Sequence, residues 1–211
     1  MSTSWRPLLS ALRSVGRVPA RYLPLAGMLV GAIGGAVYWV AAQFWPSSVA
    51  VVLSLFATSL IGGIGSEDSI AKFQPVWLDV FVLLIKYNAL MALTAANLPF
   101  SVPANLALGL IMVCGQAASH GLLVSVLVTR TEISPRVSSG ELSFALAAGF
   151  APAAVLGIPG LAGLVAAIIM RLGLAASWNR RSRPPSRTLH AVQPLTEACF
   201  YLGALATWKY V

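Results

Sequence analysis

The chain has 211 residues, of which 58% are hydrophobic and only 9% are charged. Soluble globular domains carry roughly 25% charged residues, so this composition excludes an ordinary soluble protein. The formal net charge is +8, but the basic residues stand in loops beside long apolar segments. That arrangement indicates orientation in a lipid bilayer rather than binding to nucleic acid.

A basic arm, residues 1–21, precedes the first apolar segment and is predicted to be cytoplasmic. Apolar residues recur in it at helical spacing with arginines between them; they are Trp5, Leu8, Leu9, Leu12 and Val15, with Arg6, Arg13 and Arg17. The pattern is typical of a helix that lies on an anionic membrane surface. An unstructured basic leader explains it equally well.

Residues 22–208 are predicted to form a single integral-membrane helical domain. A helix needs about 20 apolar residues to cross the bilayer core. The predicted spans are Tyr22–Trp45, Ser47–Ile64, Val76–Leu98, Ala104–Val128, Leu142–Ile158, Leu161–Trp178 and Leu189–Trp208. The last is the weakest, because His190, Gln193, Pro194 and Glu197 occupy its first half. We therefore predict an all-α, polytopic transmembrane helix bundle of six to seven spans.

The basic residues predict which ends of the spans face the cytoplasm. Eleven of the 14 Lys and Arg residues lie in four alternate flanking stretches. They are Arg6, Arg13, Arg17, Arg21, Lys72, Arg130, Arg136, Arg180, Arg181, Arg183 and Arg187. Because cytoplasmic loops are enriched in Lys and Arg, we expect a cytoplasmic N-terminus. The C-terminus lies outside if the last segment spans and inside if it does not.

Ionisable side chains within the predicted spans are costly and often mark function. Asp79 and Lys86 share one face of a helix, two turns apart, and we expect them to pair through a neighbour or each to bind a partner helix. Arg171 is expected to snorkel or to neutralise a facing acid such as Glu197. For His120 we expect a hydrogen bond that bridges two helices.

The most suggestive cytoplasmic segment covers residues 62–69, Gly-Gly-Ile-Gly-Ser-Glu-Asp-Ser. Glycines let a backbone approach phosphate closely, and neighbouring carboxylates can hold Mg²⁺. A plain turn followed by a helix start explains the same residues. The basic stretch Asn179–Arg187 likewise fits either a solvated loop or a phosphate-binding loop.

Short motifs follow one another in order from Leu8 to Trp208, over nearly the whole chain. They include Arg17-Val18-Pro19, Arg21-Tyr22-Leu23-Pro24-Leu25-Ala26-Gly27, Leu60-Ile61-Gly62-Gly63, Asp68-Ser69, Lys86-Tyr87-Asn88-Ala89-Leu90 and Leu195-Thr196-Glu197-Ala198-Cys199-Phe200-Tyr201-Leu202. In this order they resemble the motifs of the cobalamin synthase family, the adenosylcobinamide-GDP ribazoletransferases.

The resemblance implies a multi-pass enzyme of the bacterial cell inner membrane that acts in cobalamin biosynthesis. Enzymes of this family transfer adenosylcobinamide phosphate from its GDP-activated form onto α-ribazole or its 5′-phosphate. They use Mg²⁺ as cofactor and release GMP. The implied partners are corrinoid and nucleotide substrates, the lipid bilayer and proteins of cobalamin assembly, without nucleic acid.

The resemblance also implies site residues, although it assigns no catalytic residue. Glu67 and Asp68 are the implied metal ligands. The implied substrate-binding residues are Ser69, Lys72, Arg187 and Glu197. Apart from the resemblance, the charges within the spans, Asp79, Lys86, His120 and Arg171, are further candidates because of their position.

The chain departs from the family pattern where the pattern is most polar. The acidic element H-x-D-G-x-x-D-x-x-D-G is missing because Gly63 leads almost directly to Asp68, so we interpret the chain as a shortened and divergent member. Glu67 and Ile70 replace the Lys and Arg of the element K-D-S-R-x-G.

Two alternatives to an active transferase remain open. Phosphoryl transfer depends on electrostatics, so the missing acids suggest a non-catalytic relative that binds corrinoid or scaffolds cobalamin assembly. The charges within the spans suggest a small membrane transporter.

Overall fold

The computed structural model describes residues 20–63, 76–95, 104–128, 138–179 and 186–208. Within them the chain forms a 3₁₀ turn, η2 (Ala20–Tyr22), and seven α-helices. The helices are α2 (Leu23–Ala41), α3 (Ser47–Gly63), α4 (Val76–Thr94), α5 (Ala104–Val128), α6 (Ser139–Val155), α7 (Ile158–Asn179) and α8 (Ser186–Trp208). Each coincides with one predicted span apart from a few residues at its ends, so the prediction of an all-α bundle is confirmed.

Several of the described helices have the length that a membrane span requires. Among the described residues, α2, α4, α5 and α7 are each long and apolar enough to cross a membrane, whereas α3 and α6 are shorter apolar helices. The helix α8 is the least apolar of the seven, but its 23 residues extend about 34 Å, which also suffices. The chain is therefore a helical membrane protein.

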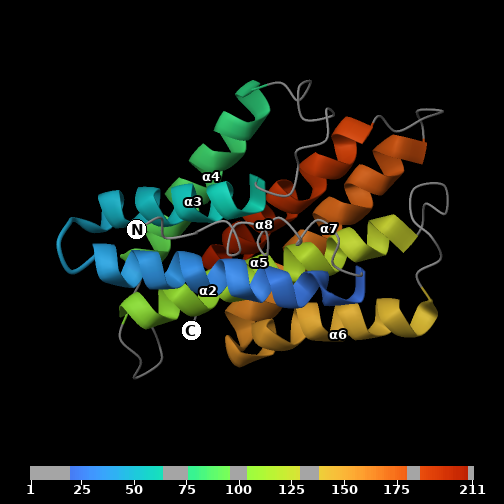
Figure 1. Ribbon diagram of the computed structural model, residues 1–211, viewed down its shortest axis with the longest axis horizontal. Coiled ribbons are helices and arrows are strands. Elements are labelled where there is room, and N and C mark those ends of the chain that lie inside the picture. Colours follow the sequence, from blue (N-terminus) through green and yellow to red (C-terminus); the bar gives the residue numbers. More distant parts are fainter. Residues whose placement is uncertain (1–19, 64–75, 96–103, 129–137, 180–185, 209–211) are drawn as a thin grey trace, which may run out of the picture.

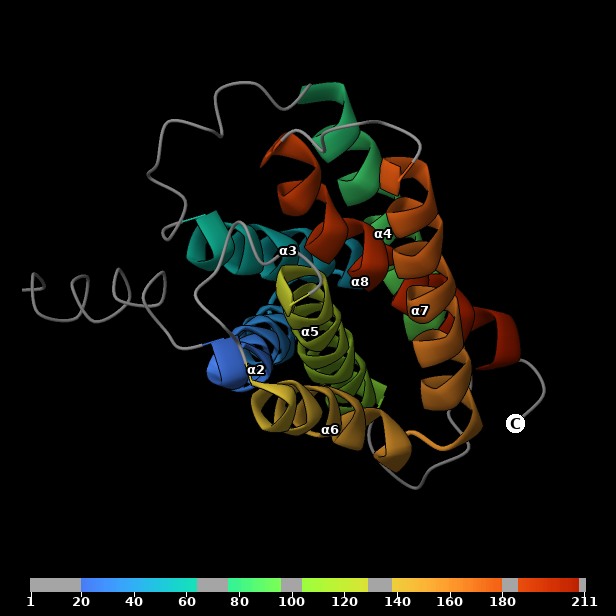
Figure 2. The same cartoon turned by 90° about the vertical axis from the view of Figure 1, so that its right-hand side faces the viewer.

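The helix α5 lies at the centre of the bundle. Figure 2 shows it end-on with α2, α3, α6, α7 and α8 around it, and it is the most deeply buried of the long apolar helices. Along the long axis, α2, α4, α6 and α8 run in one direction and α3, α5 and α7 in the other (Figure 1). The described helices therefore alternate in direction, as a polytopic topology requires.

A stripe of glycines brings α2 against α5. Gly31 and Gly35 lie one turn apart, and a Cβ atom on them would come within 2.6 Å of the Val113 Cα and 2.8 Å of the Gly109 Cα. Because distances this short are not tolerated, only glycine allows the two backbones to approach so closely. Small residues have this role in membrane helix pairs, so α2 and α5 pack in close contact.

The last two helices form an antiparallel hairpin. A Cβ atom on Gly163 would lie 2.8 Å from the Phe200 carbonyl oxygen, and one on Gly203 would lie 2.6 Å from the Ala162 carbonyl oxygen. The start of α7 therefore contacts the end of α8, and α8 runs back along the whole of α7. This arrangement agrees with the alternative in which the last predicted segment spans.

Local signals set the ends of α6. Ser138 and Glu141 form a capping box in which the Ser138 side chain accepts from the Glu141 N–H and the Glu141 side chain accepts from the Ser138 N–H. After the C-terminus of α6, Gly157 has a φ of +63°, a left-handed conformation that glycine adopts without strain. The chain then reverses and α7 begins at Ile158.

We predict that Gly31→Leu destabilises the bundle, because its Cβ would meet the backbone of α5. The expected loss is about 1–3 kcal/mol, the usual cost of overpacking a core, read as a lower midpoint of thermal unfolding in detergent. Gly173→Leu is the matched control, since a Cβ at Gly173 has no heavy atom within 4 Å. Equal midpoints for the two variants would contradict the proposed helix contact.

Candidate functional site

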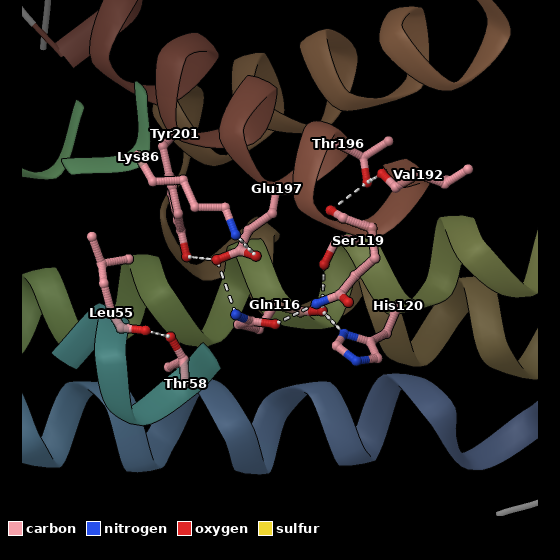
Figure 3. Close-up of polar contacts among 11 residues, drawn as sticks. Leu55, Thr58, Lys86, Gln116, Ser119, His120, Val192, Thr196, Glu197 and Tyr201 are labelled. Atoms are coloured by element: carbon pink, nitrogen blue, oxygen red, sulfur yellow. Dashed lines mark hydrogen bonds and ion pairs between the residues drawn. The ribbon is translucent and has the colours of Figure 1, made fainter. Parts of the chain in front are cut away.

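Polar side chains from three helices meet in the interior of the bundle. We call them the carboxylate cluster; its members are Lys86 of α4, Gln116 of α5, and Gln193, Glu197 and Tyr201 of α8. Figure 3 shows the side chains of Lys86, Gln116 and Tyr201 pointing toward the carboxylate of Glu197. The cluster thus gathers residues more than 100 positions apart in sequence.

The carboxylate of Glu197 is the centre of the cluster. Lys86 Nζ donates to its Oε2 at 2.5 Å. Gln116 Nε2 and Tyr201 OH donate to its Oε1 at 2.9 and 2.8 Å. The Glu197 side chain is only 1% exposed and that of Lys86 13%. A buried anion therefore has one cationic donor and two neutral donors, supplied by α4, α5 and its own helix.

A second layer of contacts orients Gln116. Gln193 Nε2 donates to Gln116 Oε1 at 3.2 Å, which leaves the Gln116 amide nitrogen to face Glu197. The Gln116 backbone carbonyl accepts from Ser119 Oγ at 3.0 Å and lies 2.8 Å from His120 Nδ1. The prediction that His120 forms a hydrogen bond between two helices is therefore wrong, because its described contact is with the backbone of its own helix. The ring turns back onto the preceding turn of α5 and packs beside Gly27 of α2.

Helical spacing explains why the cluster forms. Gln193, Glu197 and Tyr201 lie four residues apart and share one face of α8. Gly115 makes room for the tyrosine, since a Cβ there would lie 2.5 Å from Tyr201 Cε1. The polar face of α8 that weakened its prediction as a span is thus turned inward, against α4 and α5.

Burying the charges of Lys86 and Glu197 costs free energy that the contacts of the cluster must offset. Taking two opposite charges out of water costs several kcal/mol for each ion, which their attraction offsets only when hydrogen bonds complete the site. Removing one partner of such a pair typically costs about 3–5 kcal/mol because the other charge is left buried and uncompensated. Both carboxylate oxygens of Glu197 already accept hydrogen bonds, one from an ammonium and one from two neutral donors, so Glu197 is unsuited to bind Mg²⁺.

A second cation, partly buried, joins α7 to α5. Arg171 of α7 donates through Nε to Ser125 Oγ at 3.0 Å and through its guanidinium to the Ser125 carbonyl oxygen at 3.1 Å. The alternative in which Arg171 neutralises Glu197 is therefore wrong, because Lys86 takes that place. Lys86 binds a partner helix, which is one of the two predicted alternatives.

The predicted cytoplasmic end includes a smaller polar contact. Arg21 lies 3.9 Å from Glu141, and its guanidinium stacks 4.6 Å from the ring centre of Tyr22. Because both charged groups are partly exposed, the ion pair contributes little to stability. It joins the start of α2 to the start of α6, and the capping box already uses the Glu141 carboxylate.

The residues predicted to bind metal and substrate fall mainly outside the described residues. Glu67, Asp68, Ser69 and Lys72 belong to the range 64–75, and the side chain of Arg187 is also outside the description. Asp79 is described and lies on an exposed face of α4. Among the described residues no group of three or more His, Cys, Asp or Glu side chains could hold a metal.

Sequence reasoning had not assigned Gln116, Gln193 and Tyr201 to a site. A signal was nevertheless present: Gln116 interrupts the middle of a long apolar segment, and Gln193, Glu197 and Tyr201 repeat at the helical interval. Polar residues placed in this way on apolar helices are expected to bond across to a neighbour.

Comparisons with known proteins agree on one family. A family profile described as cobalamin-5-phosphate synthase matches residues 7–73. The adenosylcobinamide-GDP ribazoletransferase of Ralstonia nicotianae is 32% identical over 191 residues, covering 75% of this chain and 70% of that protein. The protein of the same name from Shewanella amazonensis is 26% identical over 221 residues, covering 90% of this chain and 85% of that protein. No solved structure matches.

The alignments also bear on the length of this chain. The Ralstonia alignment runs over 191 positions yet covers only 75% of a chain of 211 residues. The relative therefore carries residues without a counterpart here, which agrees with the prediction of a shortened member.

We predict that Gln116→Met destabilises the bundle by about 1–3 kcal/mol, because it removes a donor from the buried Glu197 carboxylate at nearly constant volume. The free energy of unfolding in detergent, measured by denaturant titration, is the readout. Gln43→Met is the matched control, since Gln43 is exposed in the turn after α2 and its described hydrogen bond goes to the Trp39 carbonyl near the end of that helix. A loss no larger than that of the control would contradict the described role of Gln116.

Proposed function

Because the chain belongs to the adenosylcobinamide-GDP ribazoletransferase family, we propose that it is a membrane transferase that joins GDP-activated adenosylcobinamide to α-ribazole or its 5′-phosphate. The observation that carries the proposal is the identity of 32% with a relative of that name, 70% of whose length is covered. A second relative of the same name is covered over 85% of its length. The helical membrane fold agrees with it.

The proposed reaction is a displacement at phosphorus. A hydroxyl oxygen of the ribazole attacks the phosphorus that carries adenosylcobinamide, and a new phosphoester bond forms. The phosphoanhydride bond to the guanylate breaks, and GMP leaves while the attacking hydroxyl loses its proton. Such reactions depend on positioning and on stabilising the negative charge of the phosphates.

We assign Mg²⁺ to Glu67 and Asp68. Carboxylate oxygens are the ligands that Mg²⁺ prefers. Among the described acids, Glu197 and Glu141 already serve the carboxylate cluster and the capping box, so neither suits the metal. When bound, the ion would offset the charge of the diphosphate. Ser69, Lys72 and Arg187 are the proposed phosphate-binding groups, since hydroxyl and cationic donors pair with phosphate oxygens.

We place the reaction at the end of the bundle where the stretches rich in Lys and Arg are predicted to lie, which we call the basic end. This end and the N-terminus face the cytoplasm in the proposal, and the protein lies in the bacterial inner membrane. The distribution of arginines supports this orientation. In the described interior, Lys86 pairs with Glu197 and Arg171 bonds to Ser125. Phosphate binding therefore needs the cations of the loops.

We predict that membranes containing the protein release GMP when supplied with adenosylcobinamide-GDP, α-ribazole and Mg²⁺. Chelation of the metal is expected to abolish the release. The double variant Glu67→Gln, Asp68→Asn is expected to lower kcat/KM by at least about 100-fold, since charge stabilisation supplies most of the rate in phosphoryl transfer. Ser143→Ala, an exposed position on α6, is the control and is expected to keep full activity.

Absence of GMP release above membranes that lack the protein would refute the transferase. In that case binding of adenosylcobinamide without Mg²⁺ would favour the non-catalytic relative, an alternative that the missing acidic element supports. Full activity of the double variant at Glu67 and Asp68 would refute the assignment of Mg²⁺ to these two residues. It would not contradict the proposed transferase activity.

A further inference from the structure

The helix α4 consists of two halves that pack differently. In the half before Lys86, Val82 is the one buried residue from Trp77 to Ile85, and large apolar side chains such as Trp77 (69% exposed) and Phe81 (59% exposed) face outward. After Lys86, Ala89, Leu90 and Leu93 are fully buried. Figure 1 shows the first half of α4 extending away from the other helices.

A groove separates this first half from α3. It has a volume of about 330 Å³ and an entirely apolar lining, made by Val52, Leu55, Val80, Leu83, Leu84 and Tyr87. Side chains on α3 therefore do not close fully around α4 between Val80 and Tyr87. Lys86 lies at the boundary between the loosely packed half and the buried half, and there it meets Glu197 of α8.

We propose that Lys86 and Glu197 are a positioning pair of the transferase: their contact fixes the tilt and register of α4, and so places the start of this helix at the basic end. The proposal rests on the proposed function, because Ser69 and Lys72 precede the start of α4 in the sequence. Neither member of the pair touches the reacting phosphates in this account.

The geometry of the contact suits this role. Apolar side chains slide past one another at little cost, whereas the Glu197 carboxylate must meet donors from α4, from α5 and from its own helix at the same time. The observed register of α4 satisfies that requirement, and a shift of one residue would turn Lys86 about 100° away from Glu197. A single polar contact inside an apolar interface can specify register in the same way in helical assemblies.

The distance from Lys86 to the start of α4 makes the position of that start sensitive to the tilt of the helix. From Lys86 to Val76 the helix extends about 15 Å, at 1.5 Å per residue. A change of tilt of about 4° at Lys86 therefore moves the start of α4 by about 1 Å, and a misplacement of that size can lower a rate by about 100-fold.

The kinetic test compares Lys86→Met, Lys86→Arg and the double variant Lys86→Met, Glu197→Met in the GMP-release assay. The double variant removes both charges, so no uncompensated ion remains to unfold the protein. We expect Lys86→Met and the double variant to lower kcat by about 10–100-fold while KM for both substrates changes less than about threefold. Lys86→Arg should recover most of kcat, because it restores a cationic donor. Phe81→Leu, on the exposed face of the same helix, is the control.

A second measurement reads the position of α4 without activity. Spin labels are attached at Trp77→Cys on α4 and Leu60→Cys on α3, both exposed, in a background with Cys114→Ala and Cys199→Ala. The distance distribution between the labels should be narrow in the parent protein and in Phe81→Leu, and should broaden or shift in the double variant.

Each outcome decides the proposal. Unchanged kcat together with an unchanged distance distribution in the double variant would show that the pair has no positioning role. A rise in KM at constant kcat would overturn it in favour of direct substrate contact. If the parent protein releases no GMP, the proposed function fails, and the distance distribution alone then supports or refutes the control of α4 by Lys86 and Glu197.

Discussion

The structure depends on one requirement, which is that the carboxylate of Glu197 must be neutralised and hydrogen-bonded inside an apolar bundle. Lys86, Gln116 and Tyr201 meet it, and they come from three helices. Because lipid offers no donors, an unpaired carboxylate at this depth would cost more than any single apolar contact returns. The positions of α4, α5 and α8 relative to one another follow from this one acid.

The central place of α5 follows from meeting two demands on adjoining faces. One face presents Gly109 and the Val113 backbone to the glycine stripe of α2, where close approach maximises van der Waals contact. The adjoining face presents Gln116 to α8 and leaves a space at Gly115 for the ring of Tyr201. A helix that packs against glycines on one face and carries a buried polar contact on the next must be enclosed on both, which agrees with its deep burial.

The sequence predicted the elements far better than their partners. Apolar runs of sufficient length identified all seven described helices. The sequence does not decide which cation pairs with Glu197, because Lys86 and Arg171 are both single cations within apolar segments and either could neutralise its carboxylate. The alignment of α4 with α8 decides between them, and that alignment is a property of the folded bundle. His120 was assigned wrongly because a ring can return to its own helix as readily as it bridges to another.

Two motifs that resemble the family separately meet in the folded chain. The motif that begins at Lys86 and the one that contains Glu197 and Tyr201 are joined by the ion pair of the carboxylate cluster, across 111 positions. The chain has only six acidic residues, and it places one of them in the apolar interior. Stability alone does not account for this choice, since apolar residues of similar volume often stabilise a bundle as well as a buried ion pair. A contact that specifies the geometry of the helices does account for it. The ion pair of the interior then belongs to the frame of the protein, and the proposed phosphate chemistry is left to the cations of the loops.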